Sequence, residues 1–182
     1  MTIHPDVKEV LLTPEQIRDG VNRMAERIAG DYRDREPVLV GVLDGAVVFL
    51  SDLMRALPIP VRVDFVKWSS YGDHSTSSGE VQLLKDLSFS VEGKHVLVVE
   101  DIVDTGLTLR YLLENLESRG VASLAVAALL DKPSRRKVRV PLDYVGFQVP
   151  DEFVVGYGLD FAQHYRNLPY VAVLKPEVYR RA

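Results

Sequence analysis

The chain has 182 residues, 47% of them hydrophobic and 26% charged, and a formal net charge of −4. This length is most simply one domain with a full core, so we expect residues 1–182 to fold as a single unit. The absence of cysteine excludes disulfides and thiolate metal sites, and the weak acidity gives no general attraction to nucleic acid or membranes. No apolar run reaches the length of a bilayer span and no secretory signal opens the chain, so we expect a cytoplasmic protein.

The first half of the sequence predicts two helices and two strands. A capping-box pattern at Thr13-Pro14-Glu15-Gln16 opens the first helix, which carries one apolar stripe and ends near Gly30. The apolar pattern then predicts a strand over 38–43, a helix over 45–57 and a strand over 61–68. The last of these alternates between apolar and polar residues, which indicates one more polar face.

The second half repeats the strand–helix rhythm. The expected elements are a strand over 95–101, a helix over 106–119, a strand over 122–130, and short strands near 144–147, 153–156 and 170–174. Strands and helices that alternate at this spacing predict an α/β fold with a mostly parallel central sheet and helices on both of its faces.

A small, polar segment at 69–79 breaks this rhythm, because it offers almost nothing to bury. Such a composition is typical of a mobile surface loop. A long loop inside a compact domain is more often functional than idle, so our hypothesis is a lid that closes over a site.

The most informative stretch is the apolar run 96–99 and the polar residues after it. Glu100 and Asp101 follow the run, and Asp104 opens an Asp-Thr-Gly-Leu-Thr turn that leads into a helix. Ligands bind at the carboxyl ends of strands in open α/β sheets, and a turn before a helix offers backbone N–H groups to a phosphate. Carboxylates beside an anion site are explained if a divalent cation or ribose hydroxyls lie between them. The pattern therefore favours a ligand with a phosphate and a sugar, bound together with a metal.

Three other interpretations of such a pattern compete with this one. A P-loop is excluded, because Gly93-Lys94 has no glycine five residues before it and no hydroxyl after it. A dinucleotide-binding loop is not supported, because Phe161 stands where the third glycine belongs in the pattern that starts at Gly156. A plain structural turn, in which Asp104 caps the following helix, remains open.

The stretch 96–108 resembles the donor-binding signature of type I phosphoribosyltransferases, which has four apolar residues, two acids, two apolar residues and Asp-Thr-Gly-x-Thr. Other stretches resemble the family's 6-oxopurine branch, whose members act on hypoxanthine and guanine. These are Leu-Asp-Lys-Pro at 130–133, Asp-Tyr-Val-Gly-Phe at 143–147, the run from Pro150 to Asp160, and Tyr-Arg-Asn-Leu at 165–168. The resemblance extends from about residue 38 to residue 174.

The resemblance implies the type I phosphoribosyltransferase fold, with a small hood of N- and C-terminal segments. It also implies a flexible lid loop over about 69–82, where Ser70 and Tyr71 match the family's lid dipeptide. The base-recognition segment would cover about 130–166. Members of this family transfer 5-phosphoribosyl from phosphoribosyl pyrophosphate to a purine, and they use Mg²⁺.

The family's donor site would fall on the residues of the signature. The resemblance assigns the ribose and 5-phosphate to Glu100, Asp101, Asp104, Thr105, Gly106, Leu107 and Thr108. It assigns Mg²⁺ to Glu100 and Asp101, with Asp160 on the pyrophosphate side, and such oxygen ligands suit this ion. Leu107 is a departure, because other members often have lysine there; we expect this to tune donor affinity without abolishing it.

Pyrophosphate would contact Leu43, Asp44, Gly45 and Arg166 by the same resemblance. In the family a cis peptide occurs at the position between Leu43 and Asp44. Several members have lysine where this chain has Asp44, so this position offers no side-chain cation. We therefore expect backbone groups of the loop and Arg166 to bind pyrophosphate.

The resemblance also assigns the purine pocket. Lys132 would donate to the 6-oxo group, Phe153 would stack on the base unless it belongs to the core, and Val154 would contact the base through its main chain. Asp104 would act as the general base at purine N7. A lysine at the 6-position favours hypoxanthine and guanine over adenine, whose amino group would leave the buried ammonium unpaired.

Two rival functions remain. Some proteins of this fold sense the donor and bind RNA or DNA, and the basic run at 132–139 could contact a phosphate backbone, although it is more simply a solvated turn. The overall acidity and the retained Asp104 argue against such a regulator, so we expect no nucleic-acid partner and no membrane partner. A sister transferase for xanthine is the second rival. The family further implies a homo-oligomer, either a dimer or a tetramer.

Overall fold

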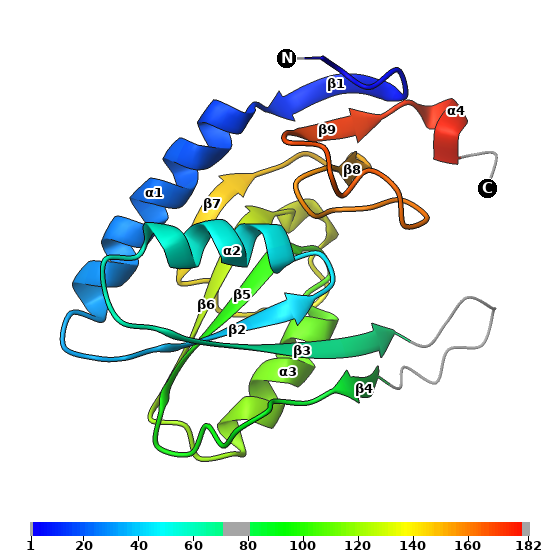
Figure 1. The fold of residues 1–182 in the computed structure, drawn as a ribbon. Helices are drawn as coiled ribbons and strands as arrows, with labels where there is room; N and C mark the ends of the chain where they lie inside the picture. The colour runs from blue at the N-terminus through cyan, green and yellow to red at the C-terminus, as the bar shows by residue number, and fades with distance from the viewer. Residues whose placement is uncertain (1, 71–80, 180–182) are drawn as a thin grey trace.

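The computed structural model describes residues 2–70 and 81–179, and Figure 1 shows a six-stranded sheet at the centre of the fold. Its strands lie in the order β4-β3-β2-β5-β6-β7. Their bounds are β2 (Val38–Leu43), β3 (Arg62–Ser70), β4 (Val81–Lys85), β5 (His95–Val103), β6 (Ser123–Asp131) and β7 (Tyr144–Gln148). All neighbours pair in parallel except β3 and β4. The expected α/β fold with a mostly parallel sheet is confirmed.

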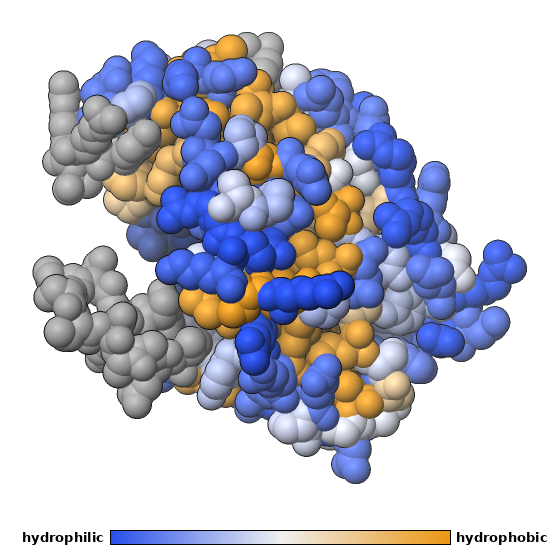
Figure 2. Space-filling view, turned by 180° about the vertical axis from the view of Figure 1, so that it is seen from behind, coloured by the Kyte–Doolittle hydropathy of each residue, from blue (hydrophilic) through white to orange (hydrophobic). Residues whose placement is uncertain are grey.

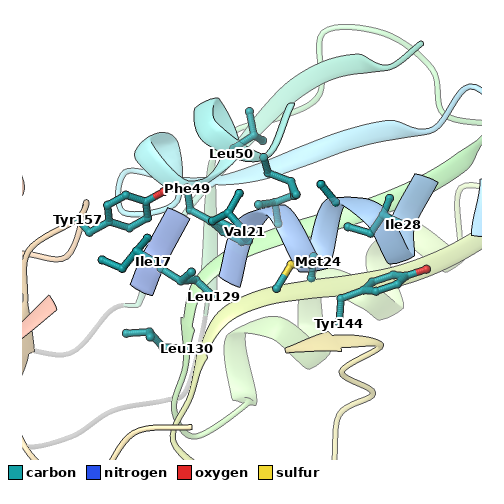
Figure 3. Packing of buried hydrophobic residues seen from close by; sticks show 14 of the residues in the cluster. Ile17, Val21, Met24, Ile28, Phe49, Leu50, Leu129, Leu130, Tyr144 and Tyr157 are labelled. Atoms are coloured by element: carbon teal, nitrogen blue, oxygen red, sulfur yellow. The ribbon is translucent and has the colours of Figure 1, made fainter. Parts of the chain in front are cut away.

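Helices cover both faces of the sheet, as the alternating pattern predicts. One face packs against α1 (Pro14–Asp31) and α2 (Val47–Ala56), and Figure 3 shows their buried side chains meeting those of the sheet. The other face packs against α3 (Leu107–Glu117). No helix in the described ranges is long and apolar enough to cross a bilayer.

The start of α1 follows its local sequence closely. The Thr13 hydroxyl accepts a hydrogen bond from the Gln16 N–H, and the Gln16 side chain accepts one from the Thr13 N–H, which completes the predicted capping box. The predicted apolar stripe is buried, and it comprises Ile17, Val21, Met24 and Ile28. The next two helices begin later than expected, α2 at Val47 and α3 at Leu107, because the preceding residues form the turns after β2 and β5.

A second sheet lies at the top of the molecule in Figure 1 and forms the expected hood. It joins β1 (Val7–Leu12), β9 (Val171–Leu174) and β8 (Val154–Val155) in antiparallel fashion, in the order β1-β9-β8. The sequence pattern indicated neither β1 nor β4. Two short helical segments, Pro133–Arg135 and α4 (Pro176–Tyr179), complete the fold.

The strands that flank the predicted lid pair with each other, Ser70 opposite Val81. Tyr71 and residues 72–80 lie outside the described residues, so the lid stays a prediction. The expected polar face of β3 is wrong at Asp64, which is only 5% exposed. Its carboxylate accepts hydrogen bonds from the backbone of Phe65 and Ser88 and from Lys85, so this acid joins β3 to the segment after β4.

Gly156→Ala is expected to lower the free energy of unfolding by at least about 2 kcal/mol. Gly156 has φ +93°, and an added Cβ would overlap the Tyr170 carbonyl oxygen. Gly30→Ala is the matched control, because nothing lies within 4 Å of its Cβ position and alanine favours a helix. Denaturant unfolding of both variants checks this, and equal stability of the two would contradict the steric argument.

Candidate functional site

A small cavity of about 130 Å³ lies where β5 passes into α3. It is lined by Glu100, Ile102, Val103, Asp104, Thr105, Gly106, Thr108 and Leu109. Gly106 takes φ +82°, which glycine adopts without strain, and an added Cβ would lie 3.1 Å from the Val138 carbonyl oxygen. Gly106, rather than Asp104, is the N-cap residue of α3, and it makes no side-chain cap hydrogen bond. Asp104 therefore does not cap the helix, so that interpretation is wrong.

Two neighbouring carboxylates lie at this edge of the sheet, Glu100 buried and Asp101 half-buried. Burial, together with the neighbouring Asp101 charge, raises the pKa of Glu100 well above its usual value. Burial also raises the pKa of Asp101 to about 6, although backbone hydrogen bonds and the nearby Arg166 oppose the rise.

Glu100 and Asp101 are the predicted ligands of the metal ion. Within residues 2–70 and 81–179, no three His, Asp or Glu side chains are grouped closely enough to form a complete metal site. Mg²⁺ usually takes one or two carboxylates and completes its shell with substrate phosphates and water, so this donor set fits it. A divalent cation would also relieve the repulsion between the Glu100 and Asp101 carboxylates.

Glu100→Gln is expected to stabilise the ligand-free protein at pH 8 by about 1–3 kcal/mol, and by less at pH 5. The pKa of Glu100 is higher in the folded than in the unfolded chain. The folded state therefore binds more protons above the unfolded pKa, and stability falls as pH rises through this window. Glutamine carries no charge that must be buried, so the variant does not lose stability in this way as pH rises. Thermal unfolding at both pH values measures the effect, and an equal gain at pH 5 and pH 8 would refute it.

The loop after β2 meets the same edge. The Leu43–Asp44 peptide is cis, as the resemblance implies. A Cβ on Gly45 would overlap the Asp101 carboxylate, and one on Gly158 would overlap the Gly45 carbonyl oxygen. Glycine at both positions therefore lets three separate segments approach one another.

Arg166 and Asp160 lie together beside this loop. One guanidinium nitrogen of Arg166 donates to the Gly158 carbonyl oxygen at 2.7 Å, and another lies 3.0 Å from the Asp160 carboxylate. The structure thus brings the predicted pyrophosphate cation and the predicted second metal ligand side by side. Their charges also reach Asp101, where Arg166 lowers the pKa and Asp160 raises it.

Position 44 carries an acid, and a lysine from another strand supplies a cation beside it. Lys67 of β3 donates to both carboxylate oxygens of Asp44, at 2.7 and 2.9 Å. The sequence pattern did not single out Lys67. Lys67 falls in line with the apolar residues Val63 and Phe65 in the alternation of β3, and nothing local linked it to Asp44.

A larger cavity of about 490 Å³ lies next to the 130 Å³ cavity. It is lined by Ile102, Asp104, Lys132, Arg135, Asp151, Glu152, Phe153, Val154, Leu159 and Asp160. All three predicted purine contacts are thus in one place. Lys132 is only 6% exposed, and its ammonium donates to the Glu152 carbonyl oxygen at 2.8 Å.

Phe153 does not belong to the core. Its side chain is 40% exposed and lies edge-to-face with Phe161, with the ring centroids 5.5 Å apart. The adjacent Val154 is buried and pairs with Val173 in the hood sheet. The ring of Phe153 therefore lies at the wall of the 490 Å³ cavity and not in the core, while the hood holds the backbone beside it.

Asp104 lines both cavities. Its Oδ1 atom is buried and accepts no hydrogen bond from the described residues. The Arg135 guanidinium lies 3.5 Å from that oxygen, too far for a good hydrogen bond. A buried acceptor without a donor is costly, so this oxygen is poised to accept a proton or a hydrogen bond from a ligand.

The basic run 132–139 is partly built into the site. Arg136 donates to the Asp104 carbonyl oxygen at 3.0 Å and to that of Val103 at 3.3 Å, and it pairs with Asp131. The Lys137 N–H donates to the Thr105 carbonyl oxygen at 2.9 Å. The solvated-turn interpretation is wrong for Arg136, which braces the turn after β5.

Figure 2 shows the opposite side of the molecule from Figure 1, with polar side chains gathered across its middle.

Known proteins resemble this chain over nearly all of its length. A family model described as "Phosphoribosyl transferase domain" matches residues 9–162. The chain is 49% identical over 174 residues to a hypoxanthine-guanine phosphoribosyltransferase of Bacillus subtilis, covering 96% of this chain and 97% of the relative. A bifunctional TilS/HprT protein of Listeria monocytogenes is 47% identical over 178 residues, and the chain spans 28% of its length.

Solved structures agree with these matches. A hypoxanthine phosphoribosyltransferase of Staphylococcus aureus superposes with a TM-score of 0.93 at 49% identity, covering 97% of this chain and 96% of that one. The corresponding protein of Trypanosoma cruzi gives a TM-score of 0.94 at 45% identity, covering 100% and 98%. By sequence and by fold, the chain belongs to the phosphoribosyltransferase family, in its hypoxanthine-guanine branch.

Proposed function

We propose that this chain is a purine-salvage enzyme. It transfers 5-phosphoribosyl from phosphoribosyl pyrophosphate to hypoxanthine or guanine, and the products are IMP or GMP and pyrophosphate. The observation that carries this proposal is the placement of Asp104, which lines both the 130 Å³ and the 490 Å³ cavity and whose buried Oδ1 atom accepts no hydrogen bond from the described residues.

The reaction breaks the bond between ribose C1 and the pyrophosphate oxygen and forms a bond from C1 to purine N9. The purine loses one proton, which Asp104 accepts at N7. Ribose C1 becomes oxocarbenium-like on the way, and the negative charge of Asp104 also stabilises it.

Each part of the donor has its own group of residues in this proposal. The 5-phosphate binds the backbone N–H groups and hydroxyls of the turn 104–108, and the pyrophosphate binds the loop 43–45 and Arg166. Glu100 and Asp101, with Asp160 on the pyrophosphate side, would hold Mg²⁺, which when bound neutralises negative charge on the donor.

The purine pocket supports a preference for 6-oxopurines. In this proposal the buried Lys132 ammonium donates to O6, and the ring of Phe153 stacks on the base. Adenine would present an amino group to the Lys132 ammonium and leave one of its buried N–H donors without an acceptor, which costs about 1–3 kcal/mol. Main-chain groups of Val154 contact the edge of the base.

A spectrophotometric assay with phosphoribosyl pyrophosphate, Mg²⁺ and each of four bases tests the proposal. Turnover of hypoxanthine and guanine, but not of adenine, is the expected result. Turnover of xanthine in preference to both would favour the sister transferase. Stabilisation by the donor without turnover of any base would favour a donor-sensing regulator instead.

Assembly and location are further parts of the proposal. We expect a homo-oligomer, a dimer or a tetramer, which sedimentation velocity of the purified chain measures. We expect a cytoplasmic location, because a donor and products with this much charge do not cross membranes unaided.

A further inference from the structure

We propose that Lys67 binds the donor's pyrophosphate, and that Asp44 positions the Lys67 ammonium for this role. The inference rests on the proposed function and extends it. It assigns to β3 a cationic side chain that binds pyrophosphate. The loop after β2 carries the acid Asp44 and so offers no such side chain.

The sheet places Lys67 at the correct edge. Lys67 lies opposite Leu43, the last residue of β2, in the parallel register of β2 and β3, so it is level with the carboxyl end of β2. The Lys67 and Asp44 side chains are 38% and 42% exposed, which leaves both open to a ligand. Ligands bind at this edge in open α/β sheets.

A continuous series of close approaches connects this pair to the rest of the donor site. Asp44 is followed by Gly45, which lies against the Asp101 carboxylate and against Gly158. Gly158 in turn accepts a hydrogen bond from Arg166. Lys67 therefore contacts the loop to which the resemblance assigns pyrophosphate, and Arg166 contacts Gly158, which lies against the same loop.

The local charges require a second cation. Asp44, Asp101 and Asp160 all lie at this edge, and Arg166 is already within 3.0 Å of Asp160. A polyanion that approached these acids with Arg166 alone would meet net repulsion. Lys67 offsets the charge of Asp44 and adds a donor that can reach phosphate oxygens.

The hydrogen-bonding capacity of Lys67 fits this role. An ammonium has three donors, and the two contacts with Asp44, at 2.7 and 2.9 Å, use two of them. Among the described residues no further partner of the Lys67 ammonium is found, so one donor is left for a ligand. The two-oxygen contact also limits the positions of a long, flexible side chain, which reduces the entropy lost on binding.

Lys67→Met is the direct test, with calorimetric titration of the full-length chain by inorganic pyrophosphate in the presence of Mg²⁺. We expect the Kd for pyrophosphate to rise by about tenfold to a hundredfold, because hydrogen bonds to charged groups are involved. The KM for phosphoribosyl pyrophosphate should rise in parallel, while the Kd for GMP, which lacks pyrophosphate, changes less than about twofold.

Arg62→Met is the matched control. Arg62 lies at the other end of β3, where it is ion-paired with Glu36 at 3.7 Å, so this variant removes the same charge from the same strand. It should bind pyrophosphate as the wild type does. An effect of Lys67→Met no larger than that of Arg62→Met would overturn the proposal.

The double variant Asp44→Asn/Lys67→Met separates direct contact from simple neutralisation, because it has the same net charge as the wild type. If Lys67 donates to pyrophosphate, the double variant remains at least about fivefold weaker than the wild type. Wild-type affinity in the double variant would overturn the direct contact.

These measurements do not depend on turnover. If the wild type converted none of the four bases, the proposed function would fail. Loss of pyrophosphate binding in Lys67→Met would still support the role of Lys67. Conversely, normal turnover together with unchanged pyrophosphate binding in this variant would overturn the role of Lys67 alone.

Discussion

Replacing Asp104 by asparagine is expected to lower kcat at least about tenfold, and as much as 10²–10⁴-fold if proton transfer limits the rate. Asparagine has nearly the same shape but cannot accept the purine proton, and it brings no negative charge to the developing cation at C1. The Oδ1 atom of Asp104 is the buried oxygen without a hydrogen bond, so the substitution acts directly at the reacting edge. Steady-state kinetics with hypoxanthine at saturating donor measures the change.

Donor binding is the internal control for this variant. The turn that would bind the 5-phosphate is held by backbone contacts, among them that of Arg136 with the Asp104 carbonyl oxygen, and these survive the substitution. The thermal shift caused by phosphoribosyl pyrophosphate with Mg²⁺ should therefore change little. Near-normal kcat in Asp104→Asn would remove Asp104 from the mechanism.

Lys132→Met is expected to lower kcat/KM for hypoxanthine and guanine by about tenfold to a hundredfold. Methionine fills a similar volume but cannot donate to O6. The Lys132 ammonium is buried at the wall of the larger cavity, where a charge-assisted hydrogen bond is not weakened by exchange with water. Competition assays with adenine should show that the ratio of 6-oxopurine to adenine turnover falls.

Lys137→Met is the matched control for Lys132. Lys137 belongs to the same basic run, but its side chain is exposed and only its backbone N–H contacts the turn after β5. This variant should keep the wild-type kcat/KM and base preference. An equal loss in both variants would mean that general charge, rather than a contact with O6, causes the effect.

The elements that depend on local pattern could be predicted from the amino-acid sequence. The capping box of α1, the apolar run of β5 and the alternation of strands and helices all follow from spacing along the chain, and the structure confirms them. The motif 96–108 indicated the phosphate turn for the same reason, since its strand, acids and turn are contiguous. The sequence pattern indicated neither β1 nor β4. Strand β1 depends on pairing with β9, which lies at the far end of the chain.

The contacts between side chains that are far apart in the sequence could be seen only in the folded chain. Lys67 and Asp44 are 23 positions apart and become partners because β2 and β3 lie in parallel register. Arg136 reaches the backbone of Asp104 across 32 positions, and Asp64 is buried despite its place on a polar strand face. Such contacts leave no periodic mark in the sequence. They arise from the folding together of several elements, where each buried or clustered charge must find a partner.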